Sequence, residues 1–127
     1  FDTAGKITIN GRYTCYNSTS KEFQFSISVG DLKVDEILVG FSSAGTSKSF
    51  RLSSINSTIE NLVTYPGRQS NVTLPDRNAG FTYLYDMDAA GFSGSPDSMS
   101  IAPVIDGNQC EVSDSLNEVD DCQSLIS

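Results

Sequence analysis

The clearest pattern along the chain is a strict alternation of apolar and polar residues over residues 23–29. A period of two places every second side chain on one face of an extended strand. Other segments give similar signals: residues 6–9, 50–52, 71–74 and 81–85 alternate, whereas 37–39 and 101–105 are apolar throughout. The pattern predicts roughly seven to nine short strands.

Glycine and proline separate these segments. Asn10-Gly11 is typical of a tight hairpin, and Pro66-Gly67 is typical of a type II turn. Further breaks occur at residues 29–31, 45–47, 75–80 and 106–108. Short strands joined in this way are typical of antiparallel sheets. We therefore predict an all-β fold, in which residues 1–127 form one antiparallel β-sandwich domain with a single core.

Helical spacing of apolar residues occurs in two segments, residues 53–62 and 112–125. In the second segment, Ser115 and Glu118 resemble a capping box at the start of a helix. A short C-terminal helix is therefore the alternative to further strands at this end of the chain.

Charge is divided unequally along the chain, whose net charge is −8. All eight lysines and arginines lie in residues 1–77 beside seven acids, whereas residues 78–127 carry nine acids and no base. Because no basic stripe is present, we expect no nucleic-acid partner. No apolar run of about 18 residues occurs, so we expect no transmembrane segment. A composition rich in serine and threonine favours a processed, secreted, extracellular chain.

The three cysteines, Cys15, Cys110 and Cys122, allow three different single disulfides. We favour Cys110 with Cys122, because these two close a short loop within an acidic C-terminal segment, residues 106–127. A bond from Cys15 to Cys110 or Cys122 is the long-range alternative, and the remaining cysteine is then buried, free or bonded to another molecule. A disulfide in either arrangement favours an oxidising compartment.

Three asparagines, Asn17, Asn56 and Asn71, stand in N-x-Ser/Thr sequons. In a secreted chain such sequons accept N-linked glycans on surface loops, so the sequence predicts a glycoprotein.

The chain contains no histidine. Catalytic systems built on Ser-His-Asp or Cys-His, and metal sites with histidine ligands, are therefore excluded. We expect a protein that is not an enzyme and that needs no cofactor.

One loop could still hold a hard cation. Asp86, Asp88 and Asp97 follow the spacing of positions 1, 3 and 12 of a calcium loop, with Gly91 at position 6. No helices flank this segment, and position 12 is Asp instead of Glu, so the segment does not match an EF-hand. We therefore predict an irregular loop site for Ca²⁺. Asp86 and Asp88 also form the carboxylate pair of an alternative hypothesis, a carbohydrate-active enzyme.

Two groups of side chains are candidates for a binding surface. Tyr83 and Tyr85 alternate on one face of a strand, where they either pack in the core or form a platform for a sugar or protein. The second group is an acidic cluster near the C-terminus: Glu111, Asp114, Glu118, Asp120 and Asp121. Its charge predicts a contact surface for a basic patch of a partner protein.

Two local resemblances agree with the predicted fold. Residues 5–12, leading to Cys15, resemble the opening of chaperone-usher pilins, which are secreted β-sandwich subunits that polymerise by lending a strand. Residues 11–15, Gly-Arg-Tyr-Thr-Cys, resemble the start of nematode transthyretin-like proteins, which are also small secreted sandwiches. We transfer no functional residue from either family.

The leading hypothesis is a non-catalytic secreted or cell-surface module that binds a protein or carbohydrate ligand through a surface of the sandwich. The alternative is a structural subunit of an extracellular filament made of like subunits, in which the N-terminal strand pairs with the sheet edge of a neighbour.

Overall fold

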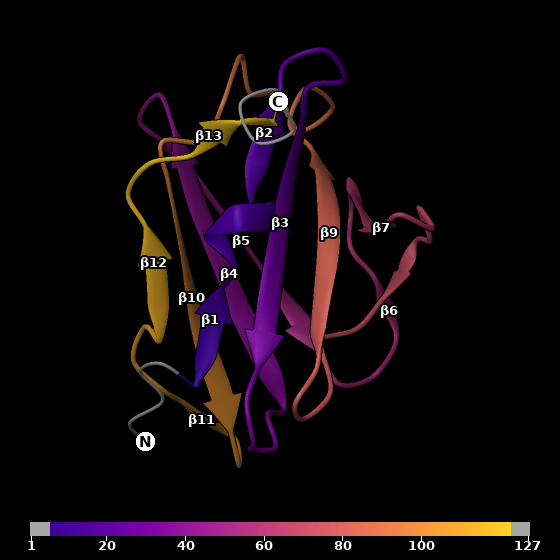
Figure 1. Cartoon of the computed structure of the whole chain (residues 1–127), viewed down its shortest axis with the longest axis vertical. Coiled ribbons are helices and arrows are strands. Elements are labelled where there is room, and N and C mark those ends of the chain that lie inside the picture. The colour runs from indigo at the N-terminus through magenta and orange to yellow at the C-terminus, as the bar shows by residue number, and fades with distance from the viewer. Residues whose placement is uncertain (1–5, 123–127) are drawn as a thin grey trace.

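The computed structural model describes residues 6–122, whose strands form two large sheets packed against each other (Figure 1). In chain order the elements are β1 (Ile7–Ile9), the 3-10 turn η1 (Gly11–Tyr13), β2 (Cys15–Asn17), β3 (Glu22–Val29), β4 (Glu36–Ser43), β5 (Thr46–Ser53), β6 (Ser57–Thr58), β7 (Leu62–Tyr65), β8 (Asn71–Val72), β9 (Gly80–Asp86), β10 (Ser98–Ile105), β11 (Asn108–Gln109), β12 (Asp114–Leu116) and β13 (Asp120–Asp121). The predicted all-β sandwich is confirmed. Within the described residues, no helix is long and apolar enough to span a membrane.

The first sheet has the strand order β13-β2-β3-β9-β7, and β1 also pairs with β3. The second sheet has the order β11-β10-β4-β5, and β12 also pairs with β10. A separate ribbon consists of β6 and β8. Every pairing is antiparallel except that of β13 with β2.

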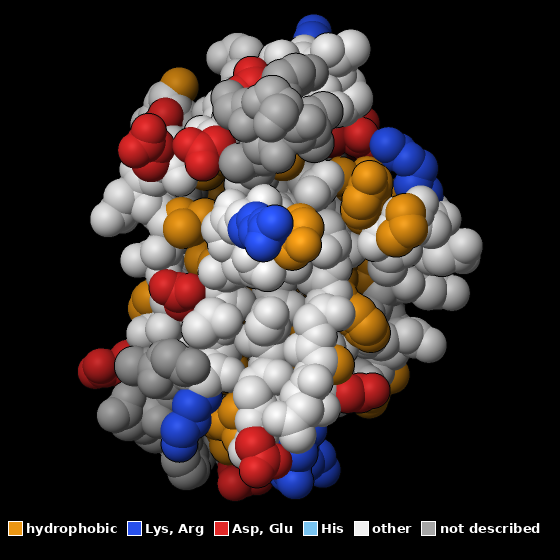
Figure 2. Space-filling view, in the orientation of Figure 1, with side chains coloured by type: hydrophobic (Ala, Val, Ile, Leu, Met, Phe, Trp, Pro, Cys, Tyr) orange, Lys and Arg blue, Asp and Glu red, His pale blue; other side chains and the backbone are white. Residues whose placement is uncertain are grey.

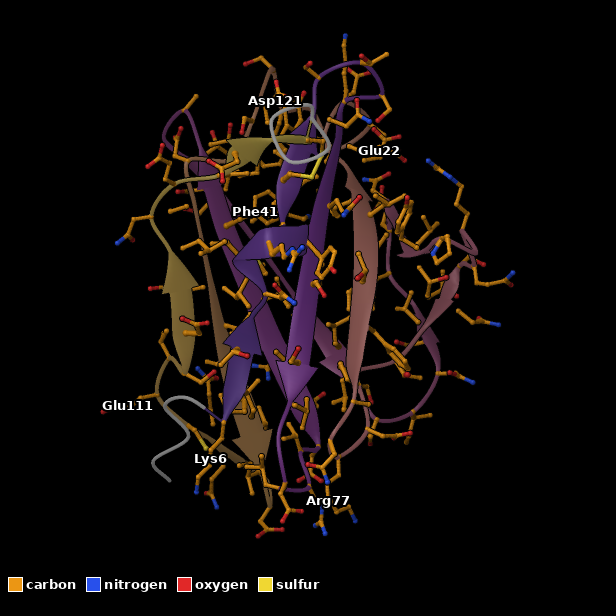
Figure 3. All side chains as sticks on the ribbon, viewed as in Figure 1. Lys6, Glu22, Phe41, Arg77, Glu111 and Asp121 are labelled. Atoms are coloured by element: carbon orange, nitrogen blue, oxygen red, sulfur yellow. A yellow bond between two sulfur atoms is a disulfide. The ribbon has the colours of Figure 1, made fainter. Side chains whose placement is uncertain are left out.

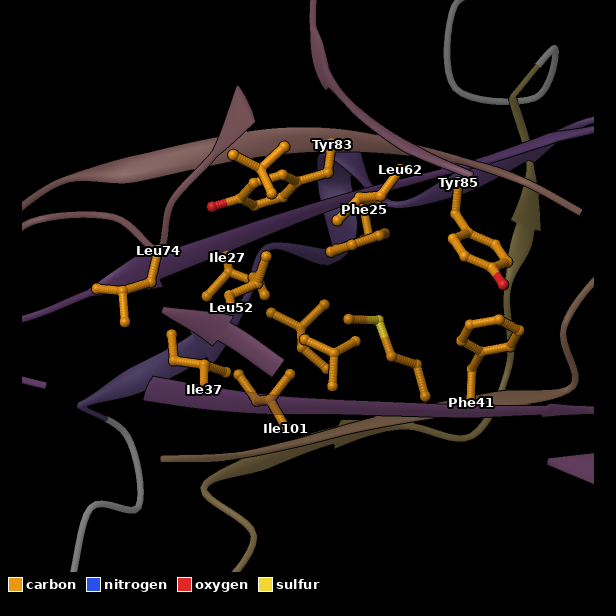
Figure 4. Close-up of a cluster of buried hydrophobic side chains, with 14 of the residues drawn as sticks. Phe25, Ile27, Ile37, Phe41, Leu52, Leu62, Leu74, Tyr83, Tyr85 and Ile101 are labelled. Atoms are coloured by element: carbon orange, nitrogen blue, oxygen red, sulfur yellow. The ribbon is translucent and has the colours of Figure 1, made fainter. Parts of the chain in front are cut away.

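The core lies between the inner faces of the two sheets (Figure 4). The alternation predicted at residues 23–29 is confirmed, because Phe23, Phe25, Ile27 and Val29 of β3 are all buried. Rings from the two sheets meet in the middle, where Phe41 of β4 lies 5.1 Å from Tyr85 of β9 between ring centroids. Such edge contacts favour one fixed arrangement of the two layers.

Turn chemistry explains the long hairpin of the second sheet. Ala44 and Gly45 adopt φ values of 51° and 84°, and Ser43 pairs with Thr46. Two consecutive positive φ angles are the signature of the two-residue turn whose twist matches that of the paired strands. This turn therefore fixes the register of β4 against β5.

The turn types predicted at Asn10-Gly11 and at Pro66-Gly67 are wrong. Asn10-Gly11 begins η1 instead of a hairpin, because Asn10 has a φ of −83° and its side chain accepts a hydrogen bond from the N–H of Arg12. At Pro66-Gly67 the Tyr65–Pro66 peptide bond is cis, and the positive φ falls on Arg68 instead of Gly67. A type II turn would need it at Gly67.

The segment from residue 112 to residue 122 forms strands, not the C-terminal helix that the sequence offered as an alternative. β12 and β13 occupy residues 114–116 and 120–121, so the helix over 112–125 is wrong there, and residues 123–125 lie outside the described region. The extended form is held by β10 on one side and by β1 on the other, since the N–H of Ile9 donates to Asp114 Oδ2 at 2.8 Å. β12 thus links the two sheets along one side of the sandwich.

The favoured disulfide between Cys110 and Cys122 is wrong, and the long-range alternative is confirmed. The structure bonds Cys15 to Cys122, with their Cα atoms 4.9 Å apart. The reason is the parallel pairing of β13 with β2, which places Asp120 beside Cys15. Cys110 follows β11 at the opposite end of the sandwich, where it is a buried free thiol (Figure 1).

Candidate functional site

A groove of about 390 Å³ lies on the outer face of the first sheet, beside the ribbon of β6 and β8. We call it the β9 groove, and define it by Glu22, Glu60, Val63, Arg68, Leu84 and Asp86. Two other hollows, of about 330 and 350 Å³, lie over the serine-rich face of the second sheet and beside residues 74–77. The β9 groove combines an apolar floor with converging charged groups, which is the usual character of a ligand site.

The floor of the groove is apolar because Leu84 and Val63 point outward. They face each other across β9 and β7, in the same row as Gln24 of β3. Leu84 is only 5% exposed although it lies on the outer face. Side chains of the chain itself therefore cover Leu84, and the apolar surface that stays open at the floor belongs to the half-buried Val63.

Opposed carboxylates dominate the electrostatics of the groove. Glu22 and Asp86 lie directly opposite each other across β3 and β9, where like charges repel. Arg68 offsets this repulsion, because its guanidinium donates two hydrogen bonds, of 2.9 and 3.0 Å, to the Glu22 carboxylate. These bonds and the charge of Glu22 raise the pKa of Arg68.

The two other acids of the groove, Glu60 and Asp86, are not neutralised. The Glu60 carboxylate is exposed and forms no ion pair or hydrogen bond with another described side chain. Asp86 Oδ1 accepts a hydrogen bond from the N–H of Ala89, which leaves its charge unpaired. The groove therefore holds three carboxylates against one guanidinium, a surplus that attracts cations.

Tyr83 and Tyr85 cannot form the binding surface that the sequence suggested. They are 0% and 1% exposed, because both lie on the inner face of β9 against the second sheet. Burial raises the pKa of Tyr83 and of Tyr85 above the usual value for a phenol. These two tyrosines belong to the core, and the prediction of an aromatic platform is wrong.

The predicted calcium site is not formed. Residues 6–122 contain no group of three acidic or thiol side chains that could hold a metal ion. Each of the three carboxylates has a different partner. Asp86 accepts a hydrogen bond from the N–H of Ala89, and Asp88 forms an ion pair with Lys21. Asp97 Oδ2 accepts a hydrogen bond from the N–H of Ala44. β9 ends at Asp86 and Asp88 lies in the turn that follows, so the two residues are not neighbours on one face of a strand, as the glycosidase hypothesis assumed.

The acidic cluster near the C-terminus is divided by the fold. Glu111 and Asp121 lie at opposite ends of the sandwich (Figure 3). Asp114, between them in sequence, is half-buried and binds the N–H of Ile9. Glu118 and Asp120 are exposed at the end that carries β13. Figure 2 shows the acidic side chains of this face in separate groups, near both ends and along one edge. Because Glu111 and Asp121 lie at opposite ends, the C-terminal acids do not make one continuous surface.

The sequon asparagines differ in exposure. Asn56 and Asn71 are exposed beside the β6–β8 ribbon, in which Thr58 pairs with Asn71. Asn17 is half-buried, and its side-chain oxygen accepts hydrogen bonds from the N–H groups of Thr19 and Ser20. Two of the three predicted glycan acceptors are therefore openly accessible.

Sequence reasoning missed the residues that form the groove. Glu22 and Arg68 are 46 positions apart, and no local pattern connects them. One signal was present: Leu84 is apolar at a position where the alternation of residues 81–85 calls for a polar side chain. An apolar residue on the polar face of a strand indicates that something covers it.

No family model, no curated protein and no solved structure matches this chain.

Proposed function

We propose that the protein is a non-catalytic binding module of the extracellular space, which receives a basic side chain of a partner protein in the β9 groove. The observation that carries this proposal is the combination of a covered apolar floor, Leu84, with three carboxylates and a single guanidinium at the rim. Lysine and arginine have the matching structure, since each joins an aliphatic stem to a cationic head.

Arg68 shows which chemistry fits the groove. It extends from the segment after β7 to Glu22 on β3, and so carries a guanidinium across the neighbouring strand β9. An arginine from a partner would place its stem on the half-buried Val63, above the covered Leu84, and its head near Glu60 and Asp86. The net charge of −8 would also speed the approach of a basic partner.

The compartment and the absence of catalysis are part of the proposal. The Cys15–Cys122 disulfide and the accessible sequons at Asn56 and Asn71 support an oxidising, extracellular setting. The lack of histidine supports a binding role over a catalytic one.

The test uses a blocked peptide, acetyl-Gly-Leu-Arg-Leu-Gly-amide, and an analogue with glutamine in place of arginine. Nitrogen-15-labelled protein is titrated with each, and amide shifts are followed. We expect the arginine peptide to shift the amides of Glu60, Val63 and Leu84. E60Q/D86N should weaken its binding by at least about tenfold, because two unpaired charges are removed. Raising the salt concentration from about 50 to about 300 mM should also weaken it.

The matched control is E111Q/D106N, which removes two acids flanking β11 at the opposite end of the sandwich. This variant should bind the arginine peptide within about twofold of the parent protein. Equal weakening in both double variants would show that total charge, not the groove, attracts the peptide. Equal binding of the glutamine analogue would also contradict the proposal.

A filament subunit is the second candidate function, favoured by the exposure of the edge strand β5. The N-terminal strand that the sequence suggests as the donor covers residues 5–10. The structure pairs β1 with β3 of its own sheet and buries Ile7 and Ile9 there, so lending this strand would open the core. Light scattering of concentrated protein tests the candidate, and a stable monomer would contradict it.

A further inference from the structure

β5 is a long edge strand whose outer side is open. Its eight residues pair with β4 over the whole length, from Thr46 to Ser53, without a bulge. Because the hairpin turn is two residues long, Ser43 and Thr46 form a hydrogen-bonded pair, and such pairs alternate along the ladder. The N–H and C=O groups of Ser47, Ser49 and Arg51 therefore point away from β4.

The chain itself shows how this edge accepts a neighbour. The C=O of Ser53 belongs to the same outward set, and it accepts a hydrogen bond from the N–H of Leu74 at 2.9 Å. Within residues 6–122, the outward groups of Ser47, Ser49 and Arg51 have no such backbone partner. The open part of the edge thus covers residues 46–51, where it exposes the side chains of Thr46 to Ser49 and of Arg51.

The charge of this edge is opposite to that of the molecule. β5 carries Lys48 and Arg51 and no acid, in a chain of net charge −8. Lys48 is exposed and forms no ion pair with another described residue, while Arg51 has a weak exposed contact of 3.5 Å with Glu36. The two cations lie three residues apart, so they stand on opposite faces of the strand.

We propose that the edge of β5 binds an extended acidic segment of a partner protein by strand addition, with two acidic residues three apart in that segment. An antiparallel strand centred on Ser49 would exchange hydrogen bonds with the outward groups of Ser47, Ser49 and Arg51. In this register one acid stands opposite Lys48 and the other opposite Arg51. This site is separate from the β9 groove and does not depend on the function proposed for it.

The register defines the probe. The blocked peptide Thr-Glu-Val-Thr-Glu-Thr-Val places its glutamates opposite Arg51 and Lys48 when it runs antiparallel to β5. The control peptide, Thr-Glu-Val-Glu-Thr-Thr-Val, has the same composition but carries both glutamates on one face. We expect the first peptide to bind about two- to fivefold more tightly, the effect of one additional cross-strand charge pair.

Amide hydrogen exchange of the full chain identifies the mode of binding. Strand addition should protect the amides of Ser47, Ser49 and Arg51, but not those of Lys48 and Phe50, which already bond to β4. S49P removes one outward N–H without breaking a bond to β4, so it should abolish binding while the fold is retained. S49A keeps this N–H and is the matched control.

A charge exchange makes the test independent of the proline variant. K48E should lose about tenfold in affinity for the first peptide, and should recover it when lysine replaces the second glutamate. Uniform protection along β5, equal affinity for both peptides, or unchanged binding by S49P would each overturn the proposal. A dimer that S49P dissociates would instead assign the edge to a second copy of the chain, and would also overturn it.

Discussion

The carboxylate of Asp114 accepts a hydrogen bond from the backbone N–H of Ile9, although the two residues are 105 positions apart in the chain. Asp114 belongs to β12 of the second sheet and Ile9 to β1 of the first. This bond therefore joins the two layers along a side where, within residues 6–122, no backbone ladder connects them.

Asp114→Ala should lower the free energy of unfolding by about 1–3 kcal/mol, because a half-buried N–H would lose its charged acceptor. Asp114→Asn keeps an acceptor oxygen, so its loss should be clearly smaller. Denaturant unfolding of both variants measures the difference. Equal losses would show that the bond to Ile9 does not stabilise the fold.

Replacing Cys15 and Cys122 together by serine should lower the free energy of unfolding by about 2–5 kcal/mol, since the bond closes most of the chain into one loop. Cys110→Ala should cost only about 1 kcal/mol, the effect of losing a small buried group. Non-reducing peptide mapping should recover Cys15 linked to Cys122. A peptide that links Cys110 to Cys122 would contradict the structure.

The strands could be predicted more fully than the contacts between them. Residues 23–29 alternate because one sheet face is buried, and this periodicity is visible in the sequence itself. The side that Tyr83 and Tyr85 face was not visible, because the second sheet that covers them consists of β4, β5, β10, β11 and β12. Likewise the disulfide follows from the pairing of β13 with β2, and no local spacing encodes this pairing.

Stability should decline at high pH through the buried tyrosines. Burial raises the pKa of Tyr83 in the fold, whereas an unfolded tyrosine ionises near pH 10. The stabilisation is therefore complete below about pH 10 and is lost at about 1.4 kcal/mol per pH unit above it, until Tyr83 ionises in the fold.

The matching variants are Tyr83→Phe and Tyr13→Phe. Tyr83→Phe should flatten the alkaline part of the stability curve, at the cost of the hydrogen bond that the hydroxyl donates to the C=O of Thr73. Tyr13→Phe removes a phenol hydroxyl at a half-exposed position outside the core and serves as the control. The same slope in both variants would assign the alkaline loss to other groups.

Arg68→Ala should increase the affinity of the β9 groove for the arginine peptide by about tenfold, because the Glu22 carboxylate is freed for the incoming guanidinium. The cost to folding should stay below about 1 kcal/mol, since the Arg68 side chain is 57% exposed. Titration and thermal unfolding measure the two effects. If Arg68→Ala instead lowers the affinity for the arginine peptide, Arg68 contacts the peptide and does not compete with it for Glu22.

The bond from Cys15 to Cys122 also determines how the molecule responds to mechanical load. A force applied between residues 6 and 122 would pass through the sulfurs, and only the short segment before Cys15 would lengthen. The 107-residue span between the cysteines, which could extend by roughly 370 Å when reduced, would carry no tension. Oxidation would thus make most of the sandwich insensitive to pulling at its ends.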